Sequence, residues 1–163
     1  MPREIERKFL VKNDDWRRLA HRSQRMRQGY LASGGRVSLR VRIAGDDARL
    51  NMKAGGLVAA RQEYEYPIPL DEARELLALA EGPLIDKTRH FVEHGGFEWE
   101  VDEFHGDNLG LVVAELELTR EDERFPSPPW LGAEVTRFAR YYNSCLVRHP
   151  YRVWTEEERL RHI

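Results

Sequence analysis

Hydrophobic and polar residues alternate at every second position along much of this chain. In the stretch EIERKFLV, which starts at residue 4, Glu4, Glu6 and Lys8 share one side of an extended backbone and apolar side chains take the other. A period of two is typical of β-strands whose two faces differ. Glycine-containing turns such as SGG, GDD and HGG separate the runs, which indicates hairpins between antiparallel strands. The pattern predicts strands over residues 3–11, 25–32, 36–44, 48–54, 61–68, 86–93, 97–104 and 111–120.

Helical signals occupy the segments between and after these strands. The first two helices begin near residues that commonly cap helices, Asn13 or Asp14 and then Asp71. The last begins with Thr155 and Glu158 at the spacing of a capping box. The predicted helices cover NDDWRRLAH at 13–21, DEARELLALAEG at 71–82, residues 133–147 after the proline-rich FPSPPW, and TEEERLRHI at 155–163.

About eight strands and few helices predict an α+β fold, an antiparallel β-barrel with helices packed outside, because closure leaves no unpaired edge strand. A length of 163 residues suits one domain spanning 1–163. The formal net charge is −2 although 33% of the residues are charged, so composition gives no reason to expect nucleic-acid binding. The single cysteine excludes an intramolecular disulfide, and we find no signal or membrane segment, so we expect a cytoplasmic protein.

The polar faces of the predicted strands are almost entirely ionised. Like charges recur two residues apart, as in Arg40 and Arg42 or in Glu115 and Glu117. Each strand alone also fits a simpler interpretation, in which the polar face meets solvent. However, like charges at this distance repel one another unless a counter-ion lies between them. If these faces turn inward, the barrel becomes a tunnel whose cations suit phosphate oxygens and whose carboxylates suit Mg²⁺ or Mn²⁺.

The series of charged motifs resembles that of the CYTH or triphosphate tunnel metalloenzyme superfamily. Glu4, Glu6 and Lys8 match the N-terminal ExExK motif of that family. The motifs LRVRI, LNMKAGGLVAARQEYEYPI, DKTRH, EVDEF, ELEL and WLGAEVT follow in the expected order over nearly the whole chain. The resemblance implies an eight-stranded antiparallel tunnel and a metal-dependent triphosphatase. It is closest to the compact bacterial members that hydrolyse inorganic tripolyphosphate.

The same resemblance implies a role for each charged residue. Glu63 and Glu65 are either partners that orient the arginines or contributors to the metal site. The implied catalytic residues are Glu4, Glu6, Lys87 and Glu117. The implied substrate-binding residues are Lys8, Arg40, Arg42, Lys53, Arg61, Lys87 and Arg89. The implied ligands of a Mg²⁺ or Mn²⁺ ion are Glu4, Glu6, Asp102, Glu115 and Glu117.

Other residues are left outside the predicted site. Glu98 and Glu100 are expected toward the tunnel mouth. In RYYNSCL, Tyr142 stands where the resemblance leads us to expect a lysine. Tyrosines and tryptophans mostly occupy strand positions that alternate with the charged ones and therefore point outward. We expect few aromatic or amide side chains in the lining. Such a lining favours tripolyphosphate over a substrate that carries a base or a thiazolium ring.

Several functions remain open from sequence alone. The leading hypothesis is metal-dependent hydrolysis of a small polyphosphate, from tripolyphosphate to pyrophosphate and phosphate. A class IV-type adenylate cyclase or a thiamine triphosphatase would need a pocket for an organic group. A non-catalytic polyphosphate- or nucleotide-binding module would have no use for carboxylates in its site. Neither a nucleic acid nor a membrane is an expected partner, and the oligomeric state is not predicted.

Overall fold

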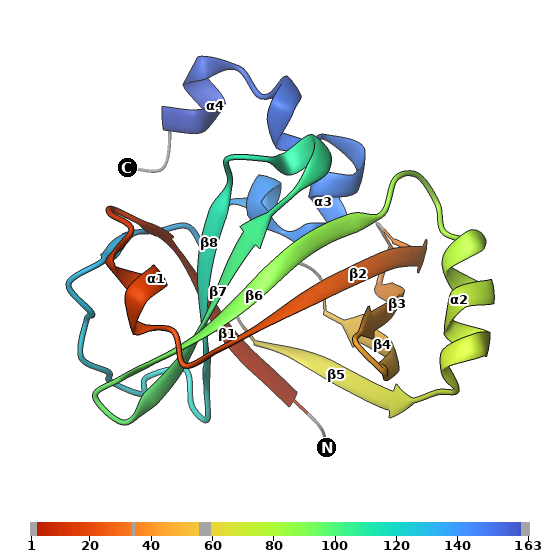
Figure 1. The fold of residues 1–163 in the computed structure, drawn as a ribbon, viewed down its shortest axis with the longest axis horizontal. Helices are drawn as coiled ribbons and strands as arrows, with labels where there is room; N and C mark the ends of the chain where they lie inside the picture. Colours follow the sequence, from red (N-terminus) through yellow and green to blue (C-terminus); the bar gives the residue numbers. More distant parts are fainter. Residues whose placement is uncertain (1–2, 34, 56–59, 161–163) are drawn as a thin grey trace.

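A computed structural model of the chain describes residues 3–33, 35–55 and 60–160, whose strands form a closed antiparallel barrel (Figure 1). The strands are β1 (Arg3–Val11), β2 (Arg22–Ala32), β3 (Val37–Ala44), β4 (Asp47–Ala54), β5 (Ala60–Pro67), β6 (Ile85–His94), β7 (Phe97–Phe104), β8 (Val112–Leu118) and β9 (Leu131–Glu134). Their order is β5-β4-β3-β2-β6-β7-β8-β1-β9, and a pairing between β5 and β1 closes the ring. The predicted α+β barrel is confirmed, and a further short strand, β9, pairs with β1.

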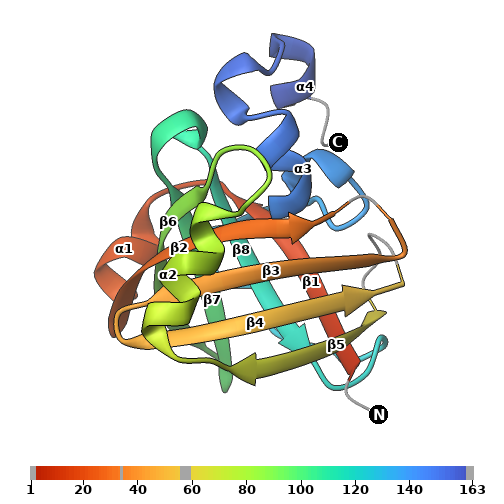
Figure 2. The same cartoon turned by 90° about the vertical axis from the view of Figure 1, so that its right-hand side faces the viewer.

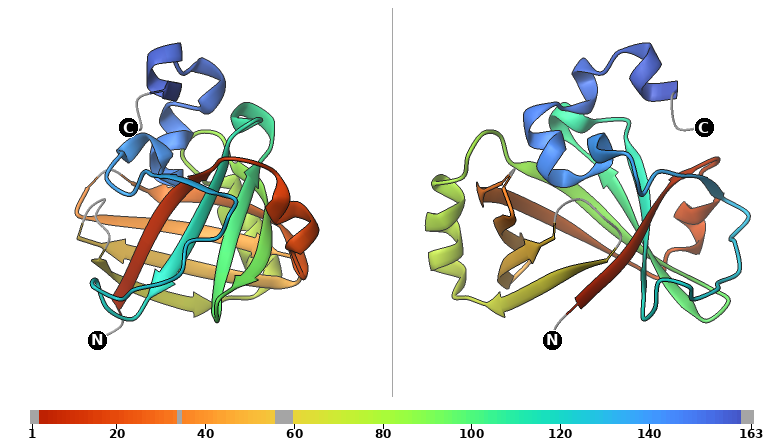
Figure 3. Two further views of the ribbon diagram at one scale, coloured as in Figure 1. Left: turned by 90° about the vertical axis from the view of Figure 1, so that its left-hand side faces the viewer. Right: turned by 180° about the vertical axis from the view of Figure 1, so that it is seen from behind.

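The helices are short and lie outside the barrel. They are α1 (Asp15–Leu19), α2 (Leu70–Ala78), α3 (Asn143–Arg148) and α4 (Glu156–Leu160), with 3-10 turns η1 (Gly106–Asn108), η2 (Ala139–Tyr141) and η3 (Tyr151–Val153). Figure 2 shows α2 lying across β2, β3 and β4, and in Figure 3 the segment from α3 to α4 lies at one end of the barrel. None of the helices in the described ranges is long and apolar enough to cross a bilayer.

The predicted helix boundaries were correct only in part. The capping box before α4 is confirmed, because the backbone N–H of Glu158 donates to Thr155 Oγ1 and that of Thr155 donates to Glu158 Oε1. The first helix is shorter than predicted, and Asn13 Oδ1 accepts from the N–H of Asp15. The second starts at Leu70 after Pro69, so Asp71 lies inside its first turn and is not its cap.

The prediction of one helix over residues 133–147 was wrong. Its first residues belong to β9, which pairs with β1 through the contacts of Leu131 with Val11 and of Glu134 with Phe9. Gly132 allows this approach, since a Cβ atom there would lie 2.9 Å from the carbonyl oxygen of Leu10. Hydrogen bonds to a neighbouring strand stabilise an extended segment whatever its own helical pattern favours. Helical structure begins only at η2 and α3.

Three apolar clusters pack against the strands of the barrel: one around Phe9, one that includes side chains of the segment from η2 to η3, and one under α2. Trp16, Trp99 and Trp130 are fully buried around Phe9 on the outer faces of β1, β7 and β8. Trp99 packs edge-to-face on Phe9 at 5.5 Å and on Trp130 at 5.6 Å between ring centroids. A smaller cluster under α2 covers the outer face of β3 and β4. Because the outer faces carry this apolar packing, the inner faces are free to be polar.

A substitution at Gly132 tests the contact between β9 and β1. We expect Gly132→Ala to lower the free energy of unfolding by about 1–3 kcal/mol, since the added methyl group meets the backbone of Leu10. Thermal unfolding followed by circular dichroism measures the change. Gly35→Ala is the matched control, since a Cβ atom there meets nothing within 4 Å. Equal melting temperatures for the two variants would contradict the close approach.

Candidate active site

The barrel encloses a cavity of about 240 Å³ with a lining that is almost wholly polar. The two glutamates and the lysine of the ExExK motif and most of the other charged motif residues contribute to it. The lining residues are Glu4, Glu6, Lys8, Tyr30, Ser38, Arg40, Arg42, Asn51, Lys53, Arg61, Glu63, Glu65, Lys87, Arg89, Glu100, Glu115, Glu117, Tyr142, Asn143 and Ser144.

Strand register explains why these side chains meet. Residues directly opposite in an antiparallel pair point to the same side of the sheet. Glu6 of β1 lies opposite Glu117 of β8, and Lys8 lies opposite Glu115. On the other side of β1, Glu4 lies opposite Arg61 of β5. Paired residues on neighbouring strands therefore point to the same side of the sheet all around the barrel, which is its interior.

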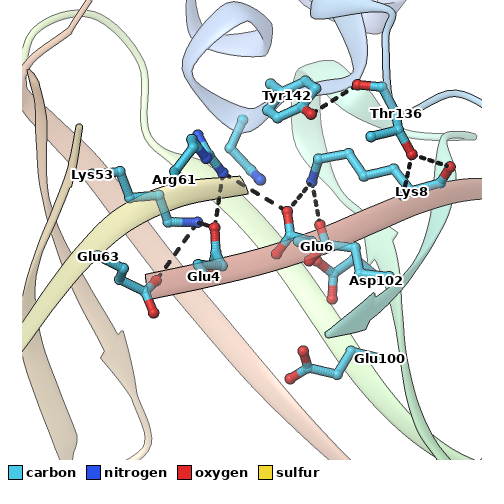
Figure 4. A network of polar contacts seen from close by, with 12 residues as sticks. Glu4, Glu6, Lys8, Lys53, Arg61, Glu63, Glu100, Asp102, Thr136 and Tyr142 are labelled. Carbon is cyan, nitrogen blue, oxygen red and sulfur yellow. Dashed lines mark hydrogen bonds and ion pairs between the residues drawn. The ribbon is translucent and has the colours of Figure 1, made fainter. Parts of the chain in front are cut away.

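The centre of the cavity is an ion-pair network around the first strand (Figure 4). Lys8 Nζ lies 2.6 Å from Glu115 Oε1 and 3.1 Å from Glu6 Oε1. Both carboxylates raise the pKa of Lys8, and this outweighs the lowering by burial. Glu4 Oε1 accepts from Arg61 at 3.0 Å and pairs with Lys53 Nζ at 3.0 Å. The ExExK motif is thus a set of paired charges and not a solvated face.

One side of the cavity is rich in arginine that carboxylates neutralise only in part. The carboxylate nearest to Arg42 is Glu65 at 3.7 Å. Burial, together with the charges of Arg40 and Arg89, lowers the pKa of Arg42 to about 10. Arg40 is 8% exposed and lies beside Tyr30, whose interaction raises the pKa of Arg40 against the effect of burial. Cations that repel one another in this way attract an anion.

Asp102, predicted as a metal ligand, lies behind the lining. It is fully buried, and its oxygens accept from Lys87 Nζ at 2.7 Å and from Arg89 at 2.8 and 2.9 Å. These cations lower the pKa of Asp102 against the effect of burial. Burial and the charge of Arg89 outweigh the attraction of Asp102 and lower the pKa of Lys87 to about 8. In this geometry Asp102 supports two lining cations from behind.

The opposite side of the cavity is acidic. Glu117 is exposed and makes no hydrogen bond or ion pair with any residue in the described ranges. Partial burial and the charges of Glu4, Glu63 and Glu100 raise the pKa of Glu117 to about 7. Glu100, which the sequence interpretation left outside the site, lines the cavity, whereas Glu98 is not in the lining. Arg89 donates to Glu100 at 3.0 Å, and burial raises the pKa of Glu100.

Glu63 and Glu65 lie among the cations of β3 and β4. Asn51 Nδ2 donates to Glu63 at 3.1 Å and to Glu65 at 3.0 Å. Glu63 also lies 3.8 Å from Lys53, and Glu65 lies 3.7 Å from Arg42. This arrangement favours the first of the two predicted roles, in which the pair orients cations of the cavity.

Sequence reasoning missed most of the neutral part of the lining. Tyr30, Asn51, Tyr142 and Asn143 all face the cavity, although few aromatic or amide side chains were expected there. Parity along β4 predicts Asn51 on the face of Lys53, and for Tyr30 the sequence leaves both core and tunnel rim open. In the fold, Arg40 lies opposite Tyr30 on one side and opposite Asn51 on the other. No strand pattern could reveal Tyr142 and Asn143, because they come from the turn before α3 and its first residue.

A model of the CYTH domain family matches residues 2–148. The chain belongs to the CYTH domain family. It is 46% identical to an inorganic triphosphatase of Acetivibrio thermocellus over 157 residues, which cover 96% of this chain and 100% of the relative. It is 38% identical to an inorganic triphosphatase of Nitrosomonas europaea over 148 residues, which cover 88% and 95%. The chain is also similar to the solved structure of an inorganic triphosphatase, with 34% sequence identity and a TM-score of 0.64. The match covers 88% of this chain and 93% of the chain in that structure.

Membership of the CYTH family implies dependence on a divalent metal ion. The acidic side of the cavity fits such an ion, because its donors are carboxylate oxygens and Glu117 is not neutralised. Within the described part of the chain, no three Asp, Glu, His or Cys residues form a ready-made metal centre. Glu6 and Glu115 are both paired with Lys8 Nζ, at 3.1 and 2.6 Å. Mg²⁺ is commonly held by one or two carboxylates together with substrate phosphates, so it needs no complete protein cage.

The raised pKa of Glu117 predicts a pH-dependent stability of the metal-free protein. Its ordinary value is 4.5 and its value in the fold is about 7, so the folded state binds the proton more tightly. The contribution of Glu117 to stability is therefore largest below about pH 4.5 and is lost as the pH rises through 7. We expect Glu117→Gln to melt at a higher temperature than the wild type above pH 7, with a chelator present. The difference should disappear near pH 4.5. A difference in melting temperature between the two proteins that stays the same at all pH values would contradict the raised pKa.

Proposed function

We propose that this CYTH protein hydrolyses inorganic tripolyphosphate to pyrophosphate and phosphate inside its barrel, with a divalent metal ion as cofactor. The observation that carries the proposal is the separation of charge in one cavity. Arginines that carboxylates neutralise only in part lie on one side, and Glu117, which has no ion pair within the described residues, lies on the other. A polyphosphate chain and a metal ion together match this lining. The relatives named as inorganic triphosphatases, which cover nearly the whole chain, support the same reaction.

The basic side chains bind the phosphate chain in this proposal. Guanidinium groups contact phosphate oxygens in pairs, and ammonium groups act as point charges. Arg40, Arg42 and Arg89 hold one end of the chain, and Lys87 contributes an ammonium beside them. Lys8, Lys53 and Arg61 lie next to the carboxylates and bind the phosphates nearest to the metal ion. Asp102 keeps Lys87 and Arg89 in position and is not among the proposed ligands, because both its oxygens are already occupied.

The acidic side chains hold the metal ion and the attacking water. We assign Glu6, Glu100 and Glu117 to a Mg²⁺ ion, with Mn²⁺ as a substitute, and Glu4 and Glu115 lie next to them on the wall. Such an ion, when bound, neutralises charge that develops on the phosphate oxygens. A carboxylate oxygen of Glu117 accepts the proton of the attacking water molecule. The water oxygen attacks the terminal phosphorus, the bond to the bridging oxygen breaks, and pyrophosphate leaves. The protein contributes positioning and charge stabilisation.

Three of the neutral lining residues are already engaged, which disfavours recognition of a base. Asn51 donates to Glu63 and Glu65, and Asn143 Oδ1 accepts from Lys87 at 3.4 Å. The ring of Tyr142 faces Lys8, and its hydroxyl donates to the carbonyl of Thr136. A site that recognises an organic group normally offers it free hydrogen-bonding or stacking partners. Inorganic tripolyphosphate has no organic group and needs only the cationic donors of the lining.

A substrate panel tests the proposal directly. We expect phosphate release from tripolyphosphate with a kcat/KM at least about tenfold higher than that for ATP, a barrier difference of about 1.4 kcal/mol. Thiamine triphosphate should also be a poorer substrate. Phosphate release is measured with Mg²⁺, with Mn²⁺ and with excess chelator, which should abolish it. A preference for ATP, cyclic AMP among the products, or the absence of any phosphate release would overturn the proposal.

Arg42→Ala separates anion binding from folding. We expect it to reduce kcat/KM by an amount corresponding to about 2–4 kcal/mol, as when one preorganised donor is removed. The melting temperature should not fall, because the variant removes a buried cation that Arg40 and Arg89 repel. Arg25→Ala is the matched control, since Arg25 pairs with Asp86 at 2.6 Å and is well exposed. A variant that loses stability and activity together would argue against this role of Arg42.

A further inference from the structure

One aromatic ring faces two cations of the ion-pair network around the first strand. Tyr142 directly precedes α3 and is 4% exposed. The centroid of its ring lies 4.7 Å from Lys8 Nζ and 5.3 Å from Arg61 Cζ. Both distances allow a cation–π attraction, which is stronger where water is excluded. Figure 4 shows the ring above the ends of both side chains.

The hydroxyl group anchors this ring from behind. It donates to the carbonyl oxygen of Thr136 at 2.8 Å. Thr136 is itself fixed to the first strand, because the backbone N–H of Lys8 donates to Thr136 Oγ1 at 3.0 Å. The N–H of Val135 also donates to the carbonyl oxygen of Lys8 at 2.8 Å. The ring is therefore held at a defined place relative to the backbone of the residue whose ammonium group it faces.

The ring differs from the other partners of these cations in carrying no charge. Lys8 contacts Glu115 at 2.6 Å and Glu6 at 3.1 Å, and Arg61 contacts Glu4 at 3.0 Å. A carboxylate attracts a cation and also neutralises it, which weakens its attraction for a phosphate group. A ring attracts the cation through its quadrupole and leaves the positive charge in place. A cation held in this way remains available to a phosphate.

We infer that Tyr142 is a positioning residue that holds Lys8 and Arg61 at the cavity wall for the phosphate chain. The inference rests on the proposed triphosphatase activity and adds a residue to which no role is assigned from sequence alone. A lysine at this position would add a third cation. The tyrosine instead orients the two that are present, and it does so without touching the reacting atoms.

Paired variants test the inference by kinetics on tripolyphosphate at saturating Mg²⁺. Tyr142→Phe keeps the ring and loses only the hydrogen bond to Thr136, so its kcat/KM should lie between that of the wild type and those of the variants without the ring. Tyr142→Leu and Tyr142→Met remove the ring and should lower kcat/KM by at least about tenfold, with a larger change in KM than in kcat. Tyr141→Leu is the matched control. Tyr141 is 2% exposed and packs on Trp154 in the apolar core, so its loss should lower the melting temperature while kcat/KM stays within about twofold.

A spectroscopic readout is independent of activity. The Tyr142 ring should shift the NMR signals of the Lys8 ε-methylene protons, assigned by their loss in Lys8→Arg. The shift should persist in Tyr142→Phe and disappear in Tyr142→Leu or Tyr142→Met. Wild-type kinetics in the ring-free variants, an unchanged Lys8 shift, or equal damage in Tyr142→Phe would each overturn the inference. A wild-type protein that releases no phosphate would overturn the proposed function instead, and the Lys8 shift would still test the contact.

Discussion

Neutralisation of buried charge inside a closed barrel is the constraint on which the rest of this structure depends. Lys8, Lys87, Asp102 and Glu115 are each at most 5% exposed. An unpaired ion at such depth costs several kcal/mol, so each of these groups has a partner of opposite charge within hydrogen-bonding distance. Removal of one member leaves the other buried and unpaired. These pairs therefore hold their side chains in fixed positions. The charges that are less completely neutralised project into the cavity.

The stability that permits this interior comes from outside the barrel. Trp16, Trp99 and Trp130 are fully buried in a layer of edge-to-face aromatic contacts on the outer faces of the strands. Large aromatic side chains contribute much of the burial in a domain of this size. An ordinary β-barrel places its apolar residues inside, and its lumen is then filled. Here the order is reversed, and a segment after β8 together with α1 and α2 covers the apolar faces.

The barrel and most of its lining could be predicted from the sequence because strand parity is a local property. The alternation of Glu4, Glu6 and Lys8 already assigns them to one face, and closure makes that face the interior. Parity gives the side of the sheet but not the depth along the barrel. Asp102 and Glu100 share a face of β7, yet Asp102 lies behind the lining and Glu100 lies in it. Which residue reaches the cavity depends on strand tilt, about which the pattern carries no information.

The C-terminal part of the site was beyond prediction for a different reason. Residues 131–134 become a strand because β1 offers them hydrogen bonds and Gly132 allows the approach, both of which are tertiary effects. The strand leads to Thr136, which in turn holds Tyr142 over the cavity. Tyr142 enters the site through a chain of contacts between segments more than a hundred residues apart in sequence, such as Lys8 and Thr136. Only the folded structure brings that chain of contacts together.

The uncompensated charges of the cavity connect its stability to its chemistry. Arg42 lies among cations and Glu117 lies among carboxylates, so each is less favourable in the fold than in water. A lining with every charge paired would be more stable, and it would have little affinity for an anion or a metal ion. Because the repulsion on both sides is already present in the folded chain, oppositely charged ligands relieve it when they bind. Ligand binding then stabilises the fold by mass action, and the repulsion within each side contributes to the affinity.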